Sequence, residues 1–131
     1  MAFEHLNKEE RIIAESAVVK GLVSDNAKYD IKVGEGFVPT NQYFTPSEIE
    51  MAKNLTQKRI DAVDESESEI KLIEFTPRLS ARTLGNLMSY SVLYKKQFTP
   101  SKPVRLVLIA GEDDKDLRVV ADAHNISVMI V

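Results

Sequence analysis

The sequence contains no cysteine. This absence excludes disulfide bonds and thiolate metal sites, so a bound metal would need oxygen or imidazole ligands. No apolar run approaches the roughly 20 residues that a membrane-spanning helix needs. The N-terminal residues, Met1 to His5, also lack the basic-then-apolar pattern of a signal peptide. These absences predict a protein of the cytoplasm, either of a cell or of an infected host cell, with no membrane partner.

Basic residues are too few for a general affinity for DNA. The 131 residues include 17 lysines and arginines against 20 acidic residues, which gives a net charge of −3. Phosphate binding needs a clustered basic surface. The chain offers one loose cluster of this kind, made of Lys95, Lys96, Lys102 and Arg105. A local basic patch therefore remains compatible with the sequence, whereas broad non-specific DNA binding does not.

The hydrophobic content is ordinary, at 44%, and the length suits one domain that spans residues 1–131. No repeat, linker or low-complexity tract divides it. Capping residues predict helices that begin after Asn7, Thr45, Ser80 and Asp113. Hydrophobic alternation and apolar runs predict strands at 28–33, 58–64, 69–76, 104–110 and 126–131. The expected fold is α/β (α+β), with a mixed five-stranded sheet flanked by helices.

Two carboxylates stand out in the central strands. If the polar stretch 65–68 is a hairpin turn, paired residue numbers sum to about 133 to 135. A sum of 135 places Asp61 opposite Glu74, and a slip of one residue puts them on opposite faces. Facing side chains begin about 4.5–5.5 Å apart, which suits two carboxylates that share one hard cation.

Glu74 lies in an otherwise apolar strand, where a carboxylate is costly unless it is paired or bound to a metal. A structural explanation stays open at this point. Glu74 could form an ion pair with Arg59, Arg78 or Arg82 near the end of the strand, without any metal or catalytic role.

Three segments, Arg59–Val63, Ile70–Pro77 and Leu84–Tyr90, resemble the strand–hairpin–helix core of the PD-(D/E)xK nuclease superfamily. The chain is most similar to small phage-encoded members with this restriction-endonuclease-like fold. In those proteins the second strand reads Ile-Glu-Val-Lys-Pro and the helix carries Gly-Gln-Leu. The likeness covers residues 28–131, and the short helix after Pro46 would be an insertion.

The resemblance implies a magnesium site made by Asp61, Glu74 and the backbone carbonyl of Phe75. It also implies a lysine that orients the attacking water, and Thr76 occupies that position here. Arg82 is the first candidate for a relocated cation. Arg78 has the same strand parity as Glu74, but Pro77 is expected to end the strand before it.

The first helix of such nucleases often adds an acidic residue. Glu15 is the most central candidate, but a solvated helix face is the better explanation of it. His5 and His124 have no ligand spacing around them and are expected on the surface. Tyr90 and Tyr94, one helical turn apart, are expected to pack rather than to stack on bases.

The replaced lysine favours a degenerate nuclease that is catalytically weak or inactive. Such a protein would act as a virion or assembly component or as a DNA-associated accessory. Its partners would be other phage structural proteins, a second copy of itself, or DNA, and it would reside in the host cytoplasm or in the virion. The alternatives are an active Mg-dependent DNA endonuclease or exonuclease with a relocated cation, and a structural domain in which Asp61 and Glu74 form ion pairs.

Overall fold

The computed structural model describes residues 3–39 and 43–131, which form an α+β fold with a mixed five-stranded sheet. The predicted fold class is confirmed. In chain order the elements are α1 (Lys8–Val19), β1 (Lys28–Val33), α2 (Pro46–Thr56), β2 (Lys58–Glu65), β3 (Ile70–Arg78), α3 (Ala81–Phe98), β4 (Val104–Glu112), α4 (Lys115–Ala123) and β5 (Ile126–Ile130).

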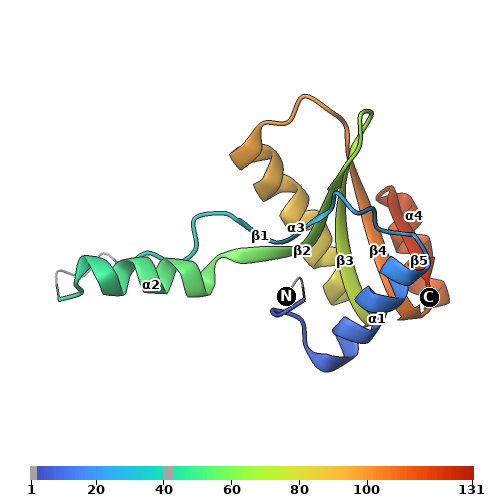
Figure 1. Ribbon diagram of the computed structural model, residues 1–131, viewed down its shortest axis with the longest axis horizontal. Helices are drawn as coiled ribbons and strands as arrows, with labels where there is room; N and C mark the ends of the chain where they lie inside the picture. The colour runs from blue at the N-terminus through green and yellow to red at the C-terminus, as the bar shows by residue number, and fades with distance from the viewer. Residues whose placement is uncertain (1–2, 40–42) are drawn as a thin grey trace.

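The strands lie in the sheet in their chain order, from β1 to β5 (Figure 1). β1, β2 and β3 pair antiparallel, and β3, β4 and β5 pair parallel. The parallel connections run through α3 and α4, because parallel neighbours need a crossover segment. The β2–β3 register pairs Ala62 with Ile73 and Glu65 with Ile70, so the paired numbers sum to 135, as one of the predicted registers requires.

Helices cover both faces of the sheet. On one face, α3 and α4 contribute Leu84, Leu87 and Ala121 to a core that includes Leu72 and Leu108 from the central strands. On the other face, Ala14 and Ala17 of α1 pack against residues that alternate with these along the same strands, among them Ile73, Phe75 and Ile109. β3 and β4 are therefore buried on both sides, which explains their continuous apolar sequences.

The predicted helix caps are confirmed at three of the four helices. Asn7, Thr45 and Ser80 each form a capping box at the start of α1, α2 and α3. The prediction that Asp113 caps the last helix is wrong. Asp114 is the cap and accepts from the backbone of Asp116 and Leu117, while Asp113 binds Arg118.

The described residues 34–39 and 43–57, which we call the arm, project from the body of the molecule (Figure 1). They include the chain that leaves β1 and the helix α2 that returns to β2. None of the α2 residues is buried. No described residue of the arm belongs to either core, so its stability as a projecting element needs a separate explanation.

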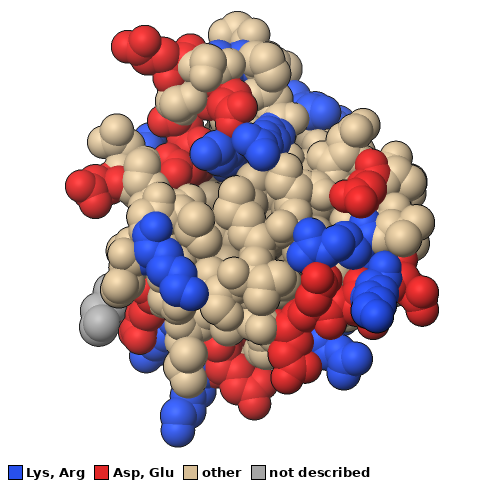
Figure 2. All heavy atoms as spheres, turned by 90° about the vertical axis from the view of Figure 1, so that its right-hand side faces the viewer, with Lys and Arg blue, Asp and Glu red and all other residues tan. Residues whose placement is uncertain are grey.

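The remaining surface carries charges of both signs. Figure 2 views the right-hand side of Figure 1, where acidic and basic side chains are interspersed around an uncharged central area. Among the residues that the structure describes, no helix has the length and apolar character to cross a lipid bilayer.

Candidate functional site

The two central carboxylates meet where β2 separates from β3. The β2–β3 ladder ends at the pair Ala62–Ile73, whereas β2 continues to pair with β1 as far as Lys58. One step beyond the ladder, Asp61 Oδ2 accepts a hydrogen bond of 2.9 Å from the backbone N–H of Phe75. The Asp61 carboxylate thus accepts the hydrogen bond that a backbone carbonyl of β2 would otherwise accept from Phe75. Beyond this point, β2 no longer pairs with β3.

Glu74 is the most perturbed acid of this site. Its side chain is 7% exposed, and its Oε2 has no hydrogen-bond partner. Burial raises the pKa of Glu74 to about 10, and the negative charge of Asp61 and a hydrogen bond to it act in the same direction. Glu74 therefore holds a proton at neutral pH when no cation is bound, because two buried carboxylates this close do not both ionise.

Charged residues of two helices also shift the pKa of Glu74. Glu10 of α1 raises the pKa of Glu74, and Arg82 at the start of α3 lowers it. The same groups act on Tyr90, whose pKa is raised first by burial and then by Glu74 and Asp61. The Asp61–Glu74 pair is therefore under the electrostatic influence of Glu10 from α1 and Arg82 from α3, and it acts in turn on Tyr90.

The expected ion pairs of Glu74 do not form. Arg59 pairs with Asp30 instead, with its Nη1 3.4 Å from Asp30 Oδ2. Arg82 is exposed and acts on Glu74 through its charge, and no hydrogen bond joins the two side chains in the described part of the chain. The purely structural explanation of Glu74 as one half of an ion pair therefore loses its main support.

Thr76 is buried, and its hydroxyl donates to the carbonyl of Arg78 at 2.9 Å. The expectation that Pro77 ends the strand is wrong, since β3 continues to Arg78, which pairs with Glu112. Odd-numbered β3 residues direct their backbone N–H groups towards β2, as Phe75 does. At Pro77, β2 no longer pairs with β3, so the N–H that proline lacks would have had no strand partner. Arg78 is exposed and is not among the charges that act on Glu74.

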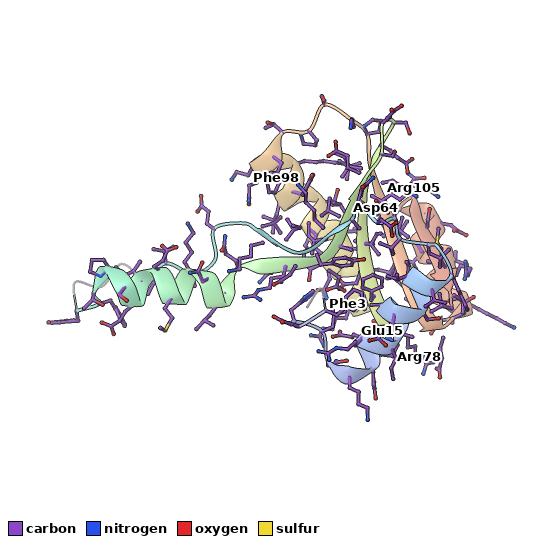
Figure 3. The ribbon with its side chains drawn as sticks, viewed as in Figure 1. Phe3, Glu15, Asp64, Arg78, Phe98 and Arg105 are labelled. Carbon is purple, nitrogen blue, oxygen red and sulfur yellow. The ribbon has the colours of Figure 1, made fainter. Side chains whose placement is uncertain are left out.

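His5 is the functional candidate that the sequence interpretation missed. Its side chain is 10% exposed, so the expectation of a surface histidine is wrong for His5, while His124 is indeed exposed. Nε2 of His5 lies 3.2 Å from Asp61 Oδ1, and its Nδ1 lies 3.8 Å from Asp30 Oδ1. Phe3 (Figure 3) anchors this N-terminal segment by edge-to-face contacts with the rings of Tyr29 and Phe75. The ring centroids of these pairs lie 5.0 and 6.3 Å apart.

The contact with His5 predicts a pH-dependent contribution to stability. The hydrogen bond to Asp61 raises the pKa of His5 above its usual 6.5. The charged form is favoured in the folded state, so this stabilisation is complete below pH 6.5 and declines as pH rises through the raised pKa. The free energy of unfolding of His5→Gln should fall below that of the wild type by more at pH 5.5 than at pH 9. Equal differences at the two pH values would contradict the contact, and His124→Gln is the exposed control.

The other acidic candidates have separate roles. Glu15 is exposed on α1 (Figure 3) and is not among the charges that act on Glu74, so the solvated-face interpretation holds. Asp64 is a buried carboxylate of the same strand as Asp61, but the backbone and hydroxyl of Ser24 satisfy its oxygens. This comparison singles out Glu74, because Asp64 shows how the fold pairs a buried acid that serves structure.

Two of the four residues in the loose basic cluster have acidic partners. Lys102 binds Glu65 at 2.6 Å, and Arg105 lies 3.7 Å from Glu69. The acidic hairpin tip is therefore partly paired rather than purely solvated. Phe98 and Arg105 lie at the opposite end of the molecule from Arg78 (Figure 3). Tyr94 is buried against Phe98, and Tyr90 is partly buried against the α3 core, as predicted.

The donor set fits a hard divalent cation in its chemistry. Asp61 and Glu74 supply carboxylate oxygens, and the unpartnered Glu74 Oε2 is a buried acceptor that a cation would satisfy. The carbonyl of Phe75 points to the same edge as its N–H, towards Asp61. Within residues 3–39 and 43–131, no three acidic or histidine side chains are grouped closely enough to form a complete protein cage. A cation here would keep several waters, as magnesium commonly does.

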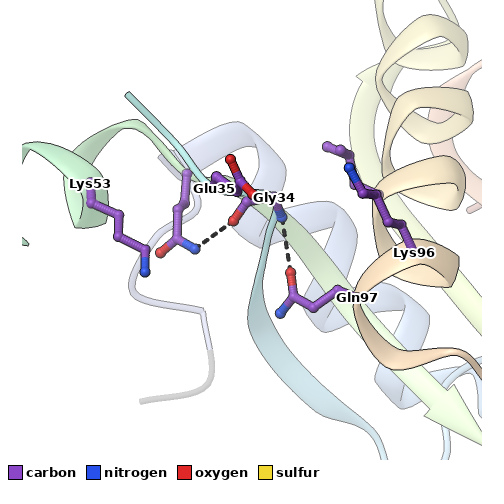
Figure 4. Close-up of a pocket in the computed structure, with 7 residues that line it drawn as sticks. Gly34, Glu35, Lys53, Lys96 and Gln97 are labelled. Atoms are coloured by element: carbon purple, nitrogen blue, oxygen red, sulfur yellow. Dashed lines mark hydrogen bonds between the residues drawn. The ribbon is translucent and has the colours of Figure 1, made fainter. Parts of the chain in front are cut away.

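A separate cavity of about 560 Å³ lies at the base of the arm (Figure 4). Lys53 and Lys96 line it from α2 and α3. Gln97 accepts from the Gly34 backbone at 3.0 Å, and Gln57 donates to the Gly34 carbonyl at 2.7 Å. The bond to Gln97 joins the base of the arm to α3, whereas the bond from Gln57 closes the base of the arm itself.

No protein-family model, no curated protein and no solved structure matches this chain. The functional conclusion accordingly depends on the geometry of Asp61, Glu74 and their neighbours.

Proposed function

We propose that this protein is a degenerate nuclease-fold domain of the PD-(D/E)xK type, catalytically weak or inactive, whose Asp61–Glu74 pair still binds a divalent cation. In the cell it would act by contact, as a virion or assembly component or as a DNA-associated accessory of a phage. The observation that carries the proposal is the unpartnered Oε2 of Glu74, buried beside Asp61 at the point where β2 and β3 separate.

A purely structural role explains this arrangement poorly. An unpartnered acceptor beside a second carboxylate destabilises the folded state. Strain of this kind is typical of functional sites and unusual in a core that only needs to pack. Asp61, Glu74 and the Phe75 carbonyl would hold the cation, which would supply charge neutralisation and polarise a bound phosphate.

The weak catalysis that we propose follows from the residue at position 76, which is threonine rather than lysine. A lysine there would place a positive charge on the same strand face as Glu74, whereas Thr76 is uncharged and its hydroxyl already donates to the backbone. Loss of one well-placed electrostatic contact commonly lowers a rate on the order of 10²–10³-fold. This loss favours a protein that binds over one that cleaves.

An active Mg-dependent deoxyribonuclease remains the second candidate, and one observation favours it. Arg82 lies close enough to lower the pKa of Glu74, and it is exposed. An exposed guanidinium at the start of α3 could take over the charge that Thr76 lacks. In that case Arg82→Gln would abolish cleavage, while Arg78→Gln would leave it unchanged.

Incubation with linear, nicked and branched DNA in Mg²⁺ or Mn²⁺ separates the two candidates. We expect no cleavage above the level of the Asp61→Asn variant, which keeps an acceptor for the Phe75 N–H. Cleavage that requires both Asp61 and Arg82 would replace the pseudo-nuclease proposal with the active one. Cleavage that is equal in wild type and Asp61→Asn would mark a contaminating nuclease.

A further inference from the structure

The arm exposes an unusual amount of apolar surface for a segment of its length. Its large exposed side chains are Phe37, Val38, Tyr43, Phe44, Met51 and Leu55. Met51 and Leu55 are 60% and 74% exposed, and they lie four residues apart, so they share one face of α2. Several large exposed apolar side chains on one short segment are typical of an interaction site or of an aggregation liability.

The arm also lacks the packing that would stabilise it alone. α2 has 11 residues and none of them is buried. Isolated helices shorter than about 12–15 residues are marginal in water, and most helices are stabilised by packing of an apolar face. The bonds to Gly34 tie only the base of the arm. Within the arm, Pro39 is buried and the Phe37 N–H donates to the Thr56 hydroxyl, but Met51 and Leu55 stay exposed. Both side chains are therefore available to a surface outside the arm.

We infer that the arm docks onto α3 of a second copy of this chain, so that two molecules exchange arms in a symmetric dimer. This inference is independent of the proposed nuclease-like site. α3 presents a matching exposed pair, Met88 and Val92, again four residues apart on one helix face. Both copies would supply an arm and a receiving helix, as a two-fold symmetric contact requires.

Charge selects α3 over the other helices as the receiving surface. α3 carries Arg82, Lys95 and Lys96, and no acidic residue occurs between Phe75 and Gly111. The arm carries Glu35, Glu48 and Glu50 against a single lysine, Lys53. By contrast, α1 also exposes apolar side chains but carries Glu9, Glu10 and Glu15 against Lys8 and Arg11. The two basic residues of α4 are offset by Asp116 and Asp122, so neither helix has the uniformly basic character of α3.

The amount of surface favours a reciprocal exchange over a one-sided contact. The three aromatic residues of one arm, at 44–81% exposure, offer roughly 300–500 Å² if a fully covered aromatic residue buries about 150–250 Å². A stable interface buries about 800 Å² per partner. With its three exposed aliphatic side chains, one arm lies near that value rather than well above it. In a reciprocal dimer each copy buries its own arm and its receiving helix, and the area per partner roughly doubles.

The first test is the mass of the full chain in solution, measured by light scattering on a sizing column. We expect twice 14.7 kDa for the wild type and 14.7 kDa for the double variant Met51→Ser, Leu55→Ser. Met88→Ser with Val92→Ser should have the same effect, because it removes the receiving pair. Val119→Ser is the matched control, since Val119 is as exposed as Val92, at 68%, and lies on α4. All these side chains are exposed, so each variant should keep the wild-type circular dichroism.

The second test uses the absence of cysteine. A chain with Leu55→Cys is mixed with a chain with Val92→Cys, and a short bis-maleimide is added. We expect a cross-linked dimer from the mixture, and at least a tenfold lower yield when Val119→Cys replaces Val92→Cys. A monomeric wild type, or a dimer that survives both double variants, would overturn the inference. Equal cross-linking with Val92→Cys and Val119→Cys would do the same.

Discussion

Replacing Glu74 by glutamine is expected to stabilise the protein at pH 7 in metal-free buffer. The carboxyl ionises near pH 4.5 in the unfolded chain and holds its proton to about pH 10 in the folded protein. The unfolded state is therefore favoured progressively as pH rises from 4.5 to 10. Over the 2.5 units up to pH 7, the wild type loses up to about 3 kcal/mol at about 1.36 kcal/mol per unit. Glutamine cannot ionise, and its amide can donate to Asp61.

The measurement is the free energy of unfolding by urea, with EDTA present, at pH 5 and at pH 8. The advantage of Glu74→Gln over the wild type should be small at pH 5 and should increase towards pH 8. Glu67→Gln is the control, because Glu67 is exposed at the hairpin tip and should leave the pH dependence unchanged. A glutamine variant that is less stable than the wild type at pH 8 would show that the carboxylate of Glu74 has a partner.

Replacing Thr76 by lysine is expected to raise DNA cleavage in Mg²⁺ on the order of 10²–10³-fold above the wild type. Position 76 lies two residues after Glu74 on the same strand face, so a lysine side chain begins where it can reach the carboxylate pair. The separation of β2 from β3 leaves this edge of the sheet open. The assay is cleavage of linear and branched DNA, with initial rates compared between variants.

The control for this variant is Thr76→Met, which adds similar bulk without charge. It should perturb folding as much as lysine does and should not raise cleavage. Because Thr76 is buried, both variants must first retain a cooperative thermal transition. Folded Thr76→Lys without any gain in cleavage would mean that the cation or the DNA does not occupy the position that the proposal gives them.

Much of the fold could be predicted from local pattern. The alternation of Lys28–Val33, the apolar strand after Val104 and the caps at Asn7, Thr45 and Ser80 all correspond to observed elements. Gly21, which follows α1, has a positive φ of 75°, as is typical of a glycine that ends a helix. The end of β3 was not predictable in this way, because a proline is tolerated in a strand only where the neighbouring strand is missing. The absence of β2 beside Pro77 depends on the tertiary structure, which local sequence patterns do not show.

The candidate site was predictable only as far as the strands determine it. The register of the hairpin, extended one step beyond its last pair Ala62–Ile73, places Asp61 opposite Glu74, so the nearness of the two follows from the hairpin. His5 reaches Asp61 from 56 positions away, and no spacing rule connects them. Its one sequence signal is the apolar setting, since Phe3 and Leu6 on either side pack into the core beside α1. The role of Arg82 likewise depends on how α3 packs on the sheet.

Thermal unfolding with increasing Mn²⁺ or Mg²⁺ tests the central claim most directly. A cation that binds the folded protein alone raises the midpoint of unfolding, and the effect grows with the ratio of ion concentration to Kd. We predict a rise for the wild type that is lost in Asp61→Asn and in Glu74→Gln and kept in Glu67→Gln. A wild type whose midpoint does not change with either ion, or equal rises in all four proteins, would contradict a divalent cation site at Asp61 and Glu74.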